Sequence, residues 1–445
     1  MIVLKKKAKK ICFISLLIII SFILLMIAFN MGTFFLHKNE LTKEERNITI
    51  SRHSELFGES KWEFQFYLPE KTDARLGISA GLLGKKTEVK LLKDQNEAVF
   101  EGKFGNQFAV FDALSLEKGY YTLHINHYRN PFNHLLFTFK AENLIFSEPL
   151  SENFMVIKEA PEKGFNWKYI LYVPEPLLIN EQDKKTAAHL MVETNNTGRP
   201  SNDMEIHLLK AKSDMSFKES VADRLNVGYL MSVFPRFYDD YDYSHSFDRK
   251  TLYTQKQDIK RLDLQLIAMI EDARTRLSEK GIQLMDKIVI GGFSSSGSFA
   301  SRFTVIHPEL VKTAVIGAPG GWPIVPLETY KGESLRFPIG IEGLENFLGK
   351  QINISALKEI PLFFFMGAED TNDSVIYRDS FDLEDEKLIF SLFGKLPVER
   401  FKIAEEIYTS NGYDAQFKIY PGVGHEVIGE MIEDMVNFIQ DAIEE

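Results

Sequence analysis

The chain has 445 residues, 44% of them hydrophobic and 26% charged, with a formal net charge of −11. This composition excludes bulk disorder, the length predicts two or three folding units, and the acidic balance argues against a nucleic-acid partner. The single cysteine, Cys12, rules out an internal disulfide and a Cys-based zinc site, and the scattered histidines predict no metal site.

Residues 1–36 are predicted to form a cytoplasmic lysine cluster and a transmembrane anchor. Lysines between residues 5 and 10 precede an apolar run from Ile11 to Phe29, which is long enough to cross a bilayer as a helix. The lysines favour the cytoplasmic side, so a single-pass membrane protein with an extracytoplasmic remainder is expected. The residues around Asn30 form a poor cleavage site, so secretion after cleavage is the less favoured alternative. Protease treatment of intact cells would test this orientation.

Residues 46–150 are predicted to form a small β-sandwich. Alternation of apolar and polar residues with a period of two is typical of half-buried strands. The stretch from Leu116 to Leu123 resembles the tyrosine corner of immunoglobulin-like sandwiches. A spacer or packing role is favoured over carbohydrate binding. The clearest alternating stretches are 62–68, 87–91 and 120–125.

Residues 164–445, after a predicted linker at 159–164, show apolar strands that alternate with longer helical segments. This pattern is typical of a mostly parallel sheet covered by helices on both faces. Apolar residues recur on one face of a helix from Ile259 to Leu277, and again in a closing helix over 428–442. The predicted strands are 169–173, 187–192, 228–233, 287–291, 311–316, 362–366 and 416–420.

The most informative stretch runs from Lys287 to Ala300, where a buried strand leads through small residues into a helix. It fits a nucleophile elbow, whose serine takes a strained conformation between small neighbours. Ser294 is favoured as nucleophile because Gly292 lies two positions before it, and Ser295 is the alternative. The backbone N–H of Ser295 is predicted to stabilise an oxyanion at the start of the helix. A Gly/Ser-rich turn that binds phosphate is the non-catalytic alternative.

Two further strand ends supply the partners that a serine nucleophile needs. One apolar strand leads to Asp370, and a Gly-rich loop after the last strand leads to His425. A serine hydroxyl is a weak nucleophile, so a base must take its proton and an acid must orient that base. The sequence therefore predicts Ser294 as nucleophile, His425 as base and Asp370 as acid. Glu369 and Asp373 remain alternative acids.

The second oxyanion donor is expected from the backbone of Asn196 or Thr197, in the loop after an early strand. That loop has no His-Gly pair, which departs from the lipase pattern and leaves the choice between the two residues open.

Two segments bear on the substrate pocket. Residues 234–245 are rich in aromatic and acidic side chains and either line the pocket or form a solvated loop. Residues 320–357 are predicted to be an insertion in the position of a cap. Trp322 either bounds an acyl pocket or, as the favoured interpretation, packs inside that insertion.

The chain from about residue 164 to 445 resembles the α/β-hydrolase superfamily, because Ser, Asp and His follow in that order, each after a predicted strand. The elbow from Gly292 to Gly297, together with residues 169–174, is similar to secreted esterases of the polyhydroxybutyrate depolymerase and feruloyl esterase group. The elbow departs from strict G-x-S-x-G, because Ser296 stands at the place of the second glycine. The resemblance implies an α/β-hydrolase fold that cleaves small or polymeric carboxylic esters through an acyl-enzyme without a cofactor.

Two other functions remain open. Serine peptidases of the prolyl-peptidase type also join a β domain to this fold, and activity on acyl-peptides against simple esters would separate them. A catalytically inactive, surface-anchored binding protein is the alternative outside enzymes, and the intact set of Ser, Asp and His argues against it.

Overall fold

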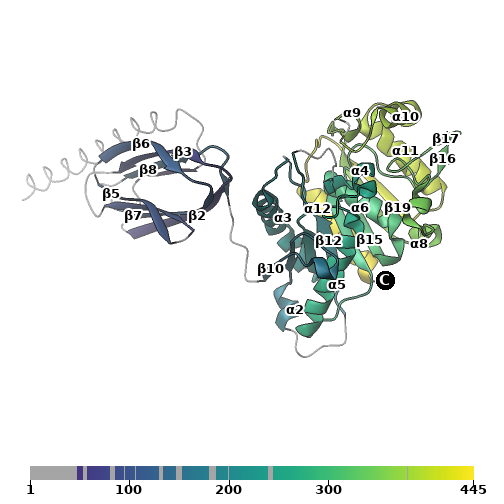
Figure 1. The fold of residues 1–445 in the computed structure, drawn as a ribbon, viewed down its shortest axis with the longest axis horizontal. Coiled ribbons are helices and arrows are strands. Elements are labelled where there is room, and N and C mark those ends of the chain that lie inside the picture. Colours follow the sequence, from purple (N-terminus) through teal and green to yellow (C-terminus); the bar gives the residue numbers. More distant parts are fainter. Residues whose placement is uncertain are drawn as a thin grey trace, which may run out of the picture. The chain divides into compact units, whose positions relative to one another are not determined.

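The structure is a computed structural model that divides into two compact units, residues 1–149 (unit 1) and 150–445 (unit 2) (Figure 1). The predicted anchor lies outside the described residues. Within the described part of the chain, no helix has the length and apolar character needed to cross a membrane. The described residues are 48–53, 58–80, 86–94, 96–105, 107–129, 134–146, 153–179, 187–198, 200–238, 244–377 and 379–444.

Unit 1 contains two antiparallel sheets, with the strand orders β1-β8-β3-β6 and β5-β4-β7-β2-β9. Side chains of both sheets share one core, which includes Ile78 of β3, Phe137 of β8 and Leu123 of β7. Every second residue of β4 from Thr87 to Leu91 is buried, which confirms the period-two interpretation. The strands are β1 (Ile48–His53), β2 (Gly58–Leu68), β3 (Thr72–Ala80), β4 (Thr87–Lys93), β5 (Glu97–Phe104), β6 (Gln107–Leu116), β7 (Gly119–Arg129), β8 (His134–Lys140) and β9 (Ile145–Phe146).

The expected tyrosine corner is present in unit 1. The Tyr121 hydroxyl donates a hydrogen bond to the Glu117 carbonyl at 2.7 Å, and its ring stacks on Phe66 with centroids 5.6 Å apart. Burial raises the pKa of Tyr121 to about 12, so the hydroxyl stays a donor at neutral pH. The bond fixes the turn between β6 and β7, as the resemblance to immunoglobulin-like sandwiches implies.

Unit 2 is built on a mixed sheet with the strand order β10-β11-β13-β12-β14-β15-β18-β19. β11 runs antiparallel to both of its neighbours, and all later pairs are parallel. A separate hairpin joins β16 (Thr329–Tyr330) to β17 (Glu333–Ser334). The sheet strands are β10 (Phe154–Ile157), β11 (Tyr169–Tyr172), β12 (Leu190–Thr194), β13 (Gly228–Ser232), β14 (Ile288–Phe293), β15 (Val311–Gly317), β18 (Leu362–Gly367) and β19 (Ala415–Tyr420).

The predicted start of this unit at Gly164 is wrong. β10 pairs with β11, so the unit starts at Leu150 and residues 159–164 connect two neighbouring strands of one sheet. β10 has only four residues, too few to show a period that would separate it from a loop.

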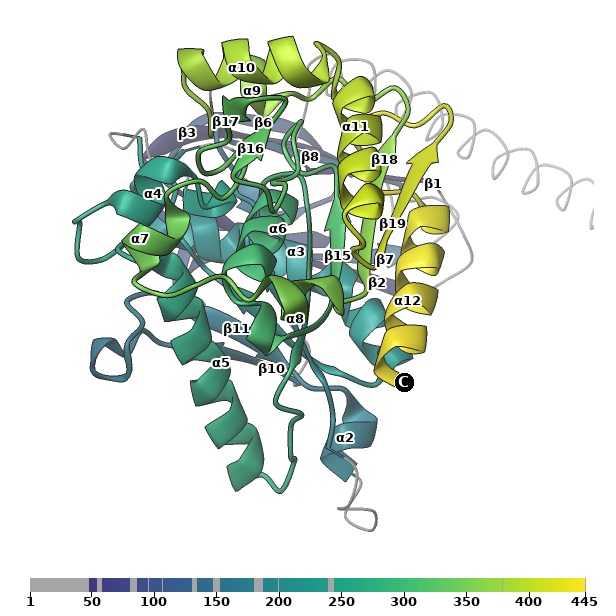
Figure 2. The same ribbon diagram turned by 90° about the vertical axis from the view of Figure 1, so that its right-hand side faces the viewer.

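Helices cover both faces of the sheet (Figures 1 and 2). Side chains of α3 and α12 share one core with one face, whereas α5, α6, α10 and α11 share a second core with the other. The predicted helix from Ile259 starts later, at Leu262, because Arg261 takes a left-handed conformation. The helices are η1 (Pro161–Lys163), α2 (Glu175–Ile179), α3 (Met204–Leu225), η2 (Ser244–Ser246), α4 (Arg249–Tyr253), α5 (Leu262–Glu279), α6 (Ser295–Ile306), η3 (Pro308–Leu310), α7 (Leu344–Leu348), α8 (Ile354–Lys358), α9 (Ser374–Tyr377), α10 (Leu383–Phe393), α11 (Pro397–Ser410) and α12 (Gly429–Glu444).

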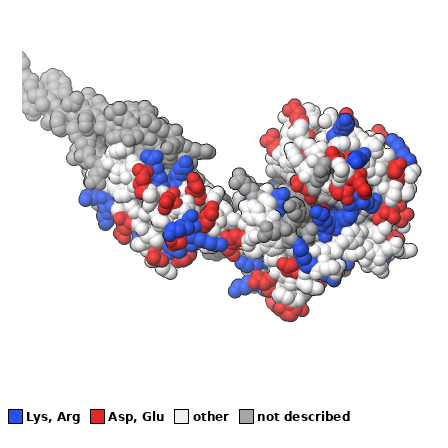
Figure 3. Space-filling view, turned by 45° about the horizontal axis from the view of Figure 1, so that its top comes forward, with Lys and Arg blue, Asp and Glu red and all other residues white. Residues whose placement is uncertain are grey.

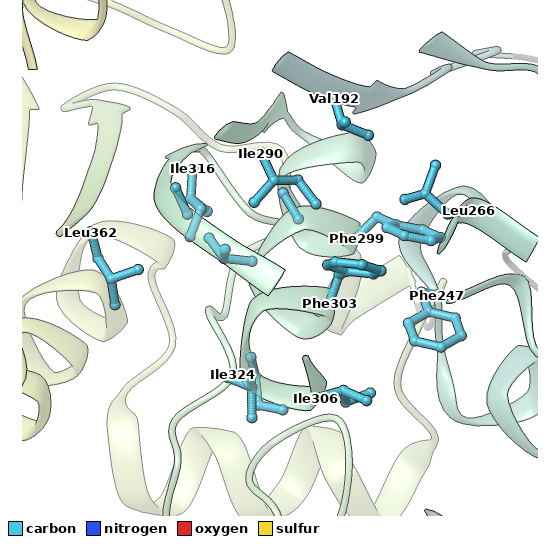
Figure 4. Packing of buried hydrophobic residues seen from close by; sticks show 14 of the residues in the cluster. Val192, Phe247, Leu266, Ile290, Phe299, Phe303, Ile306, Ile316, Ile324 and Leu362 are labelled. Carbon is cyan, nitrogen blue, oxygen red and sulfur yellow. The ribbon is translucent and has the colours of Figure 1, made fainter. Parts of the chain in front are cut away.

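The helix α6 is packed on all sides, and every one of its residues is buried. Figure 4 shows Phe299 and Phe303 of this helix among Ile290 of β14, Leu266 of α5 and Phe247. The rings of Phe247 and Phe299 lie with centroids 5.0 Å apart. This packing fixes α6, and hence the residue from which it starts, relative to the sheet.

The insertion predicted at 320–357 lies between β15 and β18 and carries the β16–β17 hairpin, α7 and α8. Trp322 is fully buried there, donates its indole N–H to the Ile339 carbonyl at 3.0 Å, and stacks on Phe393 of α10 at 4.0 Å. These contacts agree with the favoured packing role of Trp322.

Charged side chains of both signs are interspersed on the face of the molecule that Figure 3 shows, over each of the two units.

Candidate active site

Ser294 stands at a sharp turn between β14, which ends at Phe293, and α6, which begins at Ser295. Its backbone has φ 62° and ψ −120°, in a region that a residue with a side chain rarely adopts. Ser295 has no positive φ, and its hydroxyl is buried without a hydrogen-bond partner among the described residues. The structure therefore places Ser294, and not Ser295, at the apex of the turn.

The small residues around Ser294 are required by close backbone contacts. A Cβ atom on Gly292 would lie 2.4 Å from the Ser296 carbonyl carbon, and one on Gly297 would lie 2.5 Å from the Gly317 carbonyl oxygen. Ser296 fits because its Oγ accepts the Phe293 N–H at 3.0 Å. The serine at the place of the second glycine thus ties the strand end to the helix.

The sequence interpretation missed Glu193, a buried acid of β12 that lies beneath this turn. Its carboxylate accepts hydrogen bonds from the Ser296 hydroxyl at 3.2 Å and the Tyr229 hydroxyl at 2.6 Å, and pairs with Lys218 at 3.0 Å. Burial raises the pKa of Tyr229 well above its usual value, so its hydroxyl donates at neutral pH. The only signal in the sequence is one acid in an otherwise apolar strand.

Asp370 and His425 meet at the same edge of the sheet, after β18 and β19 respectively. The His425 Nδ1 lies 2.8 Å from Asp370 Oδ2, and Asp370 Oδ1 accepts the Asn372 N–H at 2.9 Å. Asp370 is buried, whereas His425 is an exposed residue whose side chain is 27% accessible. The His425 ring lies against Phe293, which precedes Ser294, with centroids 4.8 Å apart. The pair of His425 and Asp370 therefore lies beside the residue that precedes Ser294.

Neither alternative acid occupies that position. Asp373 is buried in an ion pair with Arg400 of α11 at 2.6 Å, and its other oxygen accepts the Val375 N–H at 3.0 Å. Glu369 is exposed. Asp370 is thus the carboxylate that contacts the His425 ring.

These observations identify the architecture of unit 2. A largely parallel sheet lies between two helical layers, and a serine sits on a strained strand-to-helix turn ahead of an Asp and a His at later strand ends. Unit 2 has an α/β-hydrolase fold. Within the described residues, no group of three or more His, Cys, Asp or Glu side chains is placed to hold a metal ion.

No family model and no curated protein matches the sequence. Solved structures that resemble the chain include poly(aspartic acid) hydrolase-1 from Sphingomonas sp. KT-1, with a TM-score of 0.44 and 16% identity over 66% of this chain and 100% of that one. A poly(3-hydroxybutyrate) depolymerase from Bordetella parapertussis gives a TM-score of 0.41 and 15% identity, over 64% of this chain and 87% of that one. A thermostable esterase gives a TM-score of 0.36 and 15% identity, over 85% of this chain and 96% of that one. The α/β-hydrolase fold itself is established by the strand order and the turn at Ser294.

Asn372 holds the ring nitrogen of His425 that faces away from Asp370. Its Nδ2 lies 2.8 Å from His425 Nε2. Because Nδ1 carries the proton that Asp370 accepts, Nε2 is the acceptor and the amide donates to it. The Ser294 hydroxyl has no hydrogen-bond partner within the described part of the chain. Asn372 therefore occupies the His425 nitrogen that faces away from Asp370, and no motif in the sequence indicated this contact.

The predicted oxyanion donors follow the C-terminal ends of two neighbouring parallel strands, β12 and β14. Val192 pairs with Ile290, and Asn196 and Ser294 each lie four residues beyond that pair. Neighbouring strands are about 5 Å apart, so the loop after β12 runs beside the elbow. Ser295 is the first residue of α6, where backbone N–H groups have no partner inside the helix.

The two predicted candidates in the loop after β12 differ in the structure. The Thr197 N–H donates to His245 Nδ1 at 3.3 Å, so it is engaged. Among the described residues, the Asn196 N–H has no acceptor. Asn196 is accordingly the available donor of the pair, and Thr197 is not.

The segment 234–245 is described only in part, because residues 239–243 lie outside the described residues. Phe234 and His245 are fully buried, whereas the side chain of Tyr238 is 68% exposed. The ends of the segment are therefore interior, and its role in a pocket stays a prediction.

A small pocket borders Asp370. Its lining includes Asp370 and Asn372 together with Trp322, Met366 and Phe401. Trp322 therefore has an apolar surface toward this pocket in addition to its packing contacts.

Proposed function

We propose that this chain is a serine hydrolase that cleaves carboxylic esters, with Ser294 as nucleophile, His425 as base and Asp370 as acid. The observation that carries the proposal is the strained turn at Ser294 next to the hydrogen-bonded pair of His425 and Asp370. A non-glycine residue with this backbone conformation persists only where its surroundings enforce it, and such residues cluster at active sites. A phosphate-binding turn would need neither the acid nor the base.

The chemistry follows from these positions. Ser294 Oγ attacks the carbonyl carbon while its proton passes to His425 Nε2, and the carbonyl oxygen becomes an oxyanion that the N–H groups of Ser295 and Asn196 stabilise. The C–O bond to the alcohol then breaks as His425 returns the proton to the leaving oxygen. Water, activated by the same base, cleaves the acyl-enzyme. Asp370 fixes the tautomer and stabilises the imidazolium throughout.

The activity is tested by labelling the purified chain with a fluorophosphonate and by comparing p-nitrophenyl esters with acyl-peptides as substrates. We expect covalent labelling in the peptide that contains Ser294, and faster hydrolysis of the esters. A chain that neither reacts with the probe nor hydrolyses esters would be a binding protein with an inactive hydrolase fold. Faster cleavage of acyl-peptides would show a serine peptidase instead.

Asn372 must release Nε2 before the Ser294 proton can move there, because Nε2 has one lone pair. Asn372→Ala removes the competing donor. A hydrogen bond of this kind has a net strength of about 0.5–1.5 kcal/mol, so the variant should react with the fluorophosphonate faster, by about two- to tenfold. The second-order labelling rate is the measurement, with the thermal unfolding temperature as a check of folding. A slower reaction in a folded variant would mean that Asn372 holds the imidazole in its productive orientation.

A further inference from the structure

A buried polar cluster lies under the loop that carries Asn196. It contains two histidines, His207 of α3 and His245 of η2, which we term the histidine clamp, together with Asn195 and Thr197 of the loop. All four residues are buried, with exposed fractions between 0% and 3%. The two imidazole rings meet edge to face, with centroids 5.8 Å apart. Polar groups so deeply buried are stable only when they are paired, so the contacts of each one define its state.

His245 is a neutral acceptor for the loop backbone. Its Nδ1 accepts the Thr197 N–H at 3.3 Å, so the ring proton is on Nε2, which lies 2.8 Å from the Phe234 carbonyl and donates to it. Burial lowers the pKa of His245 to about 3, which keeps the ring neutral at ordinary pH. An imidazolium would have a proton on Nδ1 and would repel the Thr197 N–H.

His207 holds the side chain of the same threonine. Its Nε2 lies 2.9 Å from the Ser201 carbonyl and 3.3 Å from the Arg236 N–H. The closer carbonyl can only accept, so the ring proton is on Nε2, and Nδ1 accepts the Thr197 hydroxyl proton at 3.0 Å. Burial lowers the pKa of His207 as well. Thr197 is therefore fixed through its backbone by one histidine and through its side chain by the other.

The residue on the other side of Asn196 is fixed too. Asn195 donates from Nδ2 to the Phe234 carbonyl at 3.0 Å and accepts the Phe234 N–H at 2.8 Å, and its own N–H donates to the Ser232 carbonyl at 3.2 Å. Asn196 thus lies between two immobilised neighbours. Its own N–H is the group left without a partner among the described residues.

The clamp is also joined to the elbow helix. The guanidinium of Arg302 in α6 donates to the Ser246 carbonyl at 2.6 Å, and Phe247 packs on Phe299 of the same helix. Because α6 starts immediately after Ser294, these contacts fix the positions of η2 and of the loop after β12 relative to Ser294.

We propose that His207 and His245 are positioning residues of the oxyanion hole, which fix Thr197 so that the Asn196 N–H points at the developing oxyanion. This role rests on the proposed function, because an oxyanion forms only if Ser294 attacks a carbonyl. The histidines do not touch the substrate. Their effect is exerted on the transition state, since the donor matters most when negative charge has developed on the oxygen.

The test uses Thr197→Val and Thr197→Ser in the full chain. Valine has the shape of threonine and keeps the backbone N–H, but it removes the hydroxyl that His207 binds, whereas serine retains that hydroxyl. We expect Thr197→Val to lower kcat for a p-nitrophenyl ester by about tenfold or more, within the roughly 10²–10³-fold that loss of an oxyanion donor costs. KM should stay unchanged, and Thr197→Ser should restore kcat.

Hydrogen exchange at the amide of residue 197 supplies a readout that does not depend on catalysis. The valine variant should exchange faster than the wild type, and the serine variant should not. Faster exchange with unchanged kcat would overturn the positioning role, and so would equal losses in both variants. If the amide of residue 197 exchanges at the wild-type rate in Thr197→Val, His207 does not hold the loop. If the wild type hydrolyses no ester, the proposed function fails, and the exchange rates alone decide whether the clamp exists.

Discussion

Replacing Ser294 with alanine is expected to abolish fluorophosphonate labelling and to lower ester turnover by roughly 10⁴- to 10⁶-fold. Ser294 is the only one of the three consecutive serines with a positive φ, so it alone presents its hydroxyl at the apex of the turn. The measurements are single-turnover labelling and kcat/KM for a p-nitrophenyl ester, with circular dichroism to show that the fold persists.

The matched control is Ser295→Ala. The Ser295 hydroxyl is buried and makes no hydrogen bond to another described residue, so its removal should leave both labelling and turnover close to wild-type values. Covalent labelling of the Ser294→Ala variant at Ser295 would show that the nucleophile was assigned one residue too early.

Asp370→Asn is expected to lower turnover by about 10⁴-fold, because an amide in this place favours the wrong imidazole tautomer. The Asp370 carboxylate accepts the Nδ1 proton of His425 at 2.8 Å, which leaves Nε2 free of a proton and able to act as the base. The variant should fold normally and react slowly with the fluorophosphonate. Measuring kcat and the labelling rate for the same preparation would show both effects.

The control for this variant is Asp373→Asn, three residues along the same loop. Asp373 and Arg400 form an ion pair whose side chains are 3% and 0% exposed. Removing the negative charge leaves the Arg400 guanidinium buried without compensation, which costs about 3–5 kcal/mol of folding free energy. Denaturant unfolding should show this loss while the folded variant still hydrolyses esters. Normal stability with lost turnover would instead mean that Asp373 is the acid.

The sequence was informative where function and fold depend on neighbouring residues. The strands of unit 2 around Ser294 are continuous apolar runs, and the small residues at Gly292 and Gly297 follow from a close strand-to-helix contact. Asp370 and His425 could be predicted for the same reason, because each follows a recognisable strand. β10 was missed because four residues at a sheet edge carry no period.

The rest of the site depends on contacts between residues that are far apart in the chain. Thr197 appeared equivalent to Asn196 in the sequence, and only the position of His245, 48 residues later, distinguishes them. Asn372 was missed because its importance comes from one contact with a loop 53 residues away. Such pairings are set by how helices and loops pack on the sheet, which composition and periodicity do not encode.

The strained backbone at Ser294 lowers the folding free energy of the chain. A non-glycine residue held with a positive φ gives up about 1–3 kcal/mol of folding free energy, which glycine at the same position would recover without a change of fold. Glycine, however, has no hydroxyl, so it could not fill the role of nucleophile proposed for Ser294. If Ser294 has that role, the chain carries the strain of this turn as a cost in folding free energy.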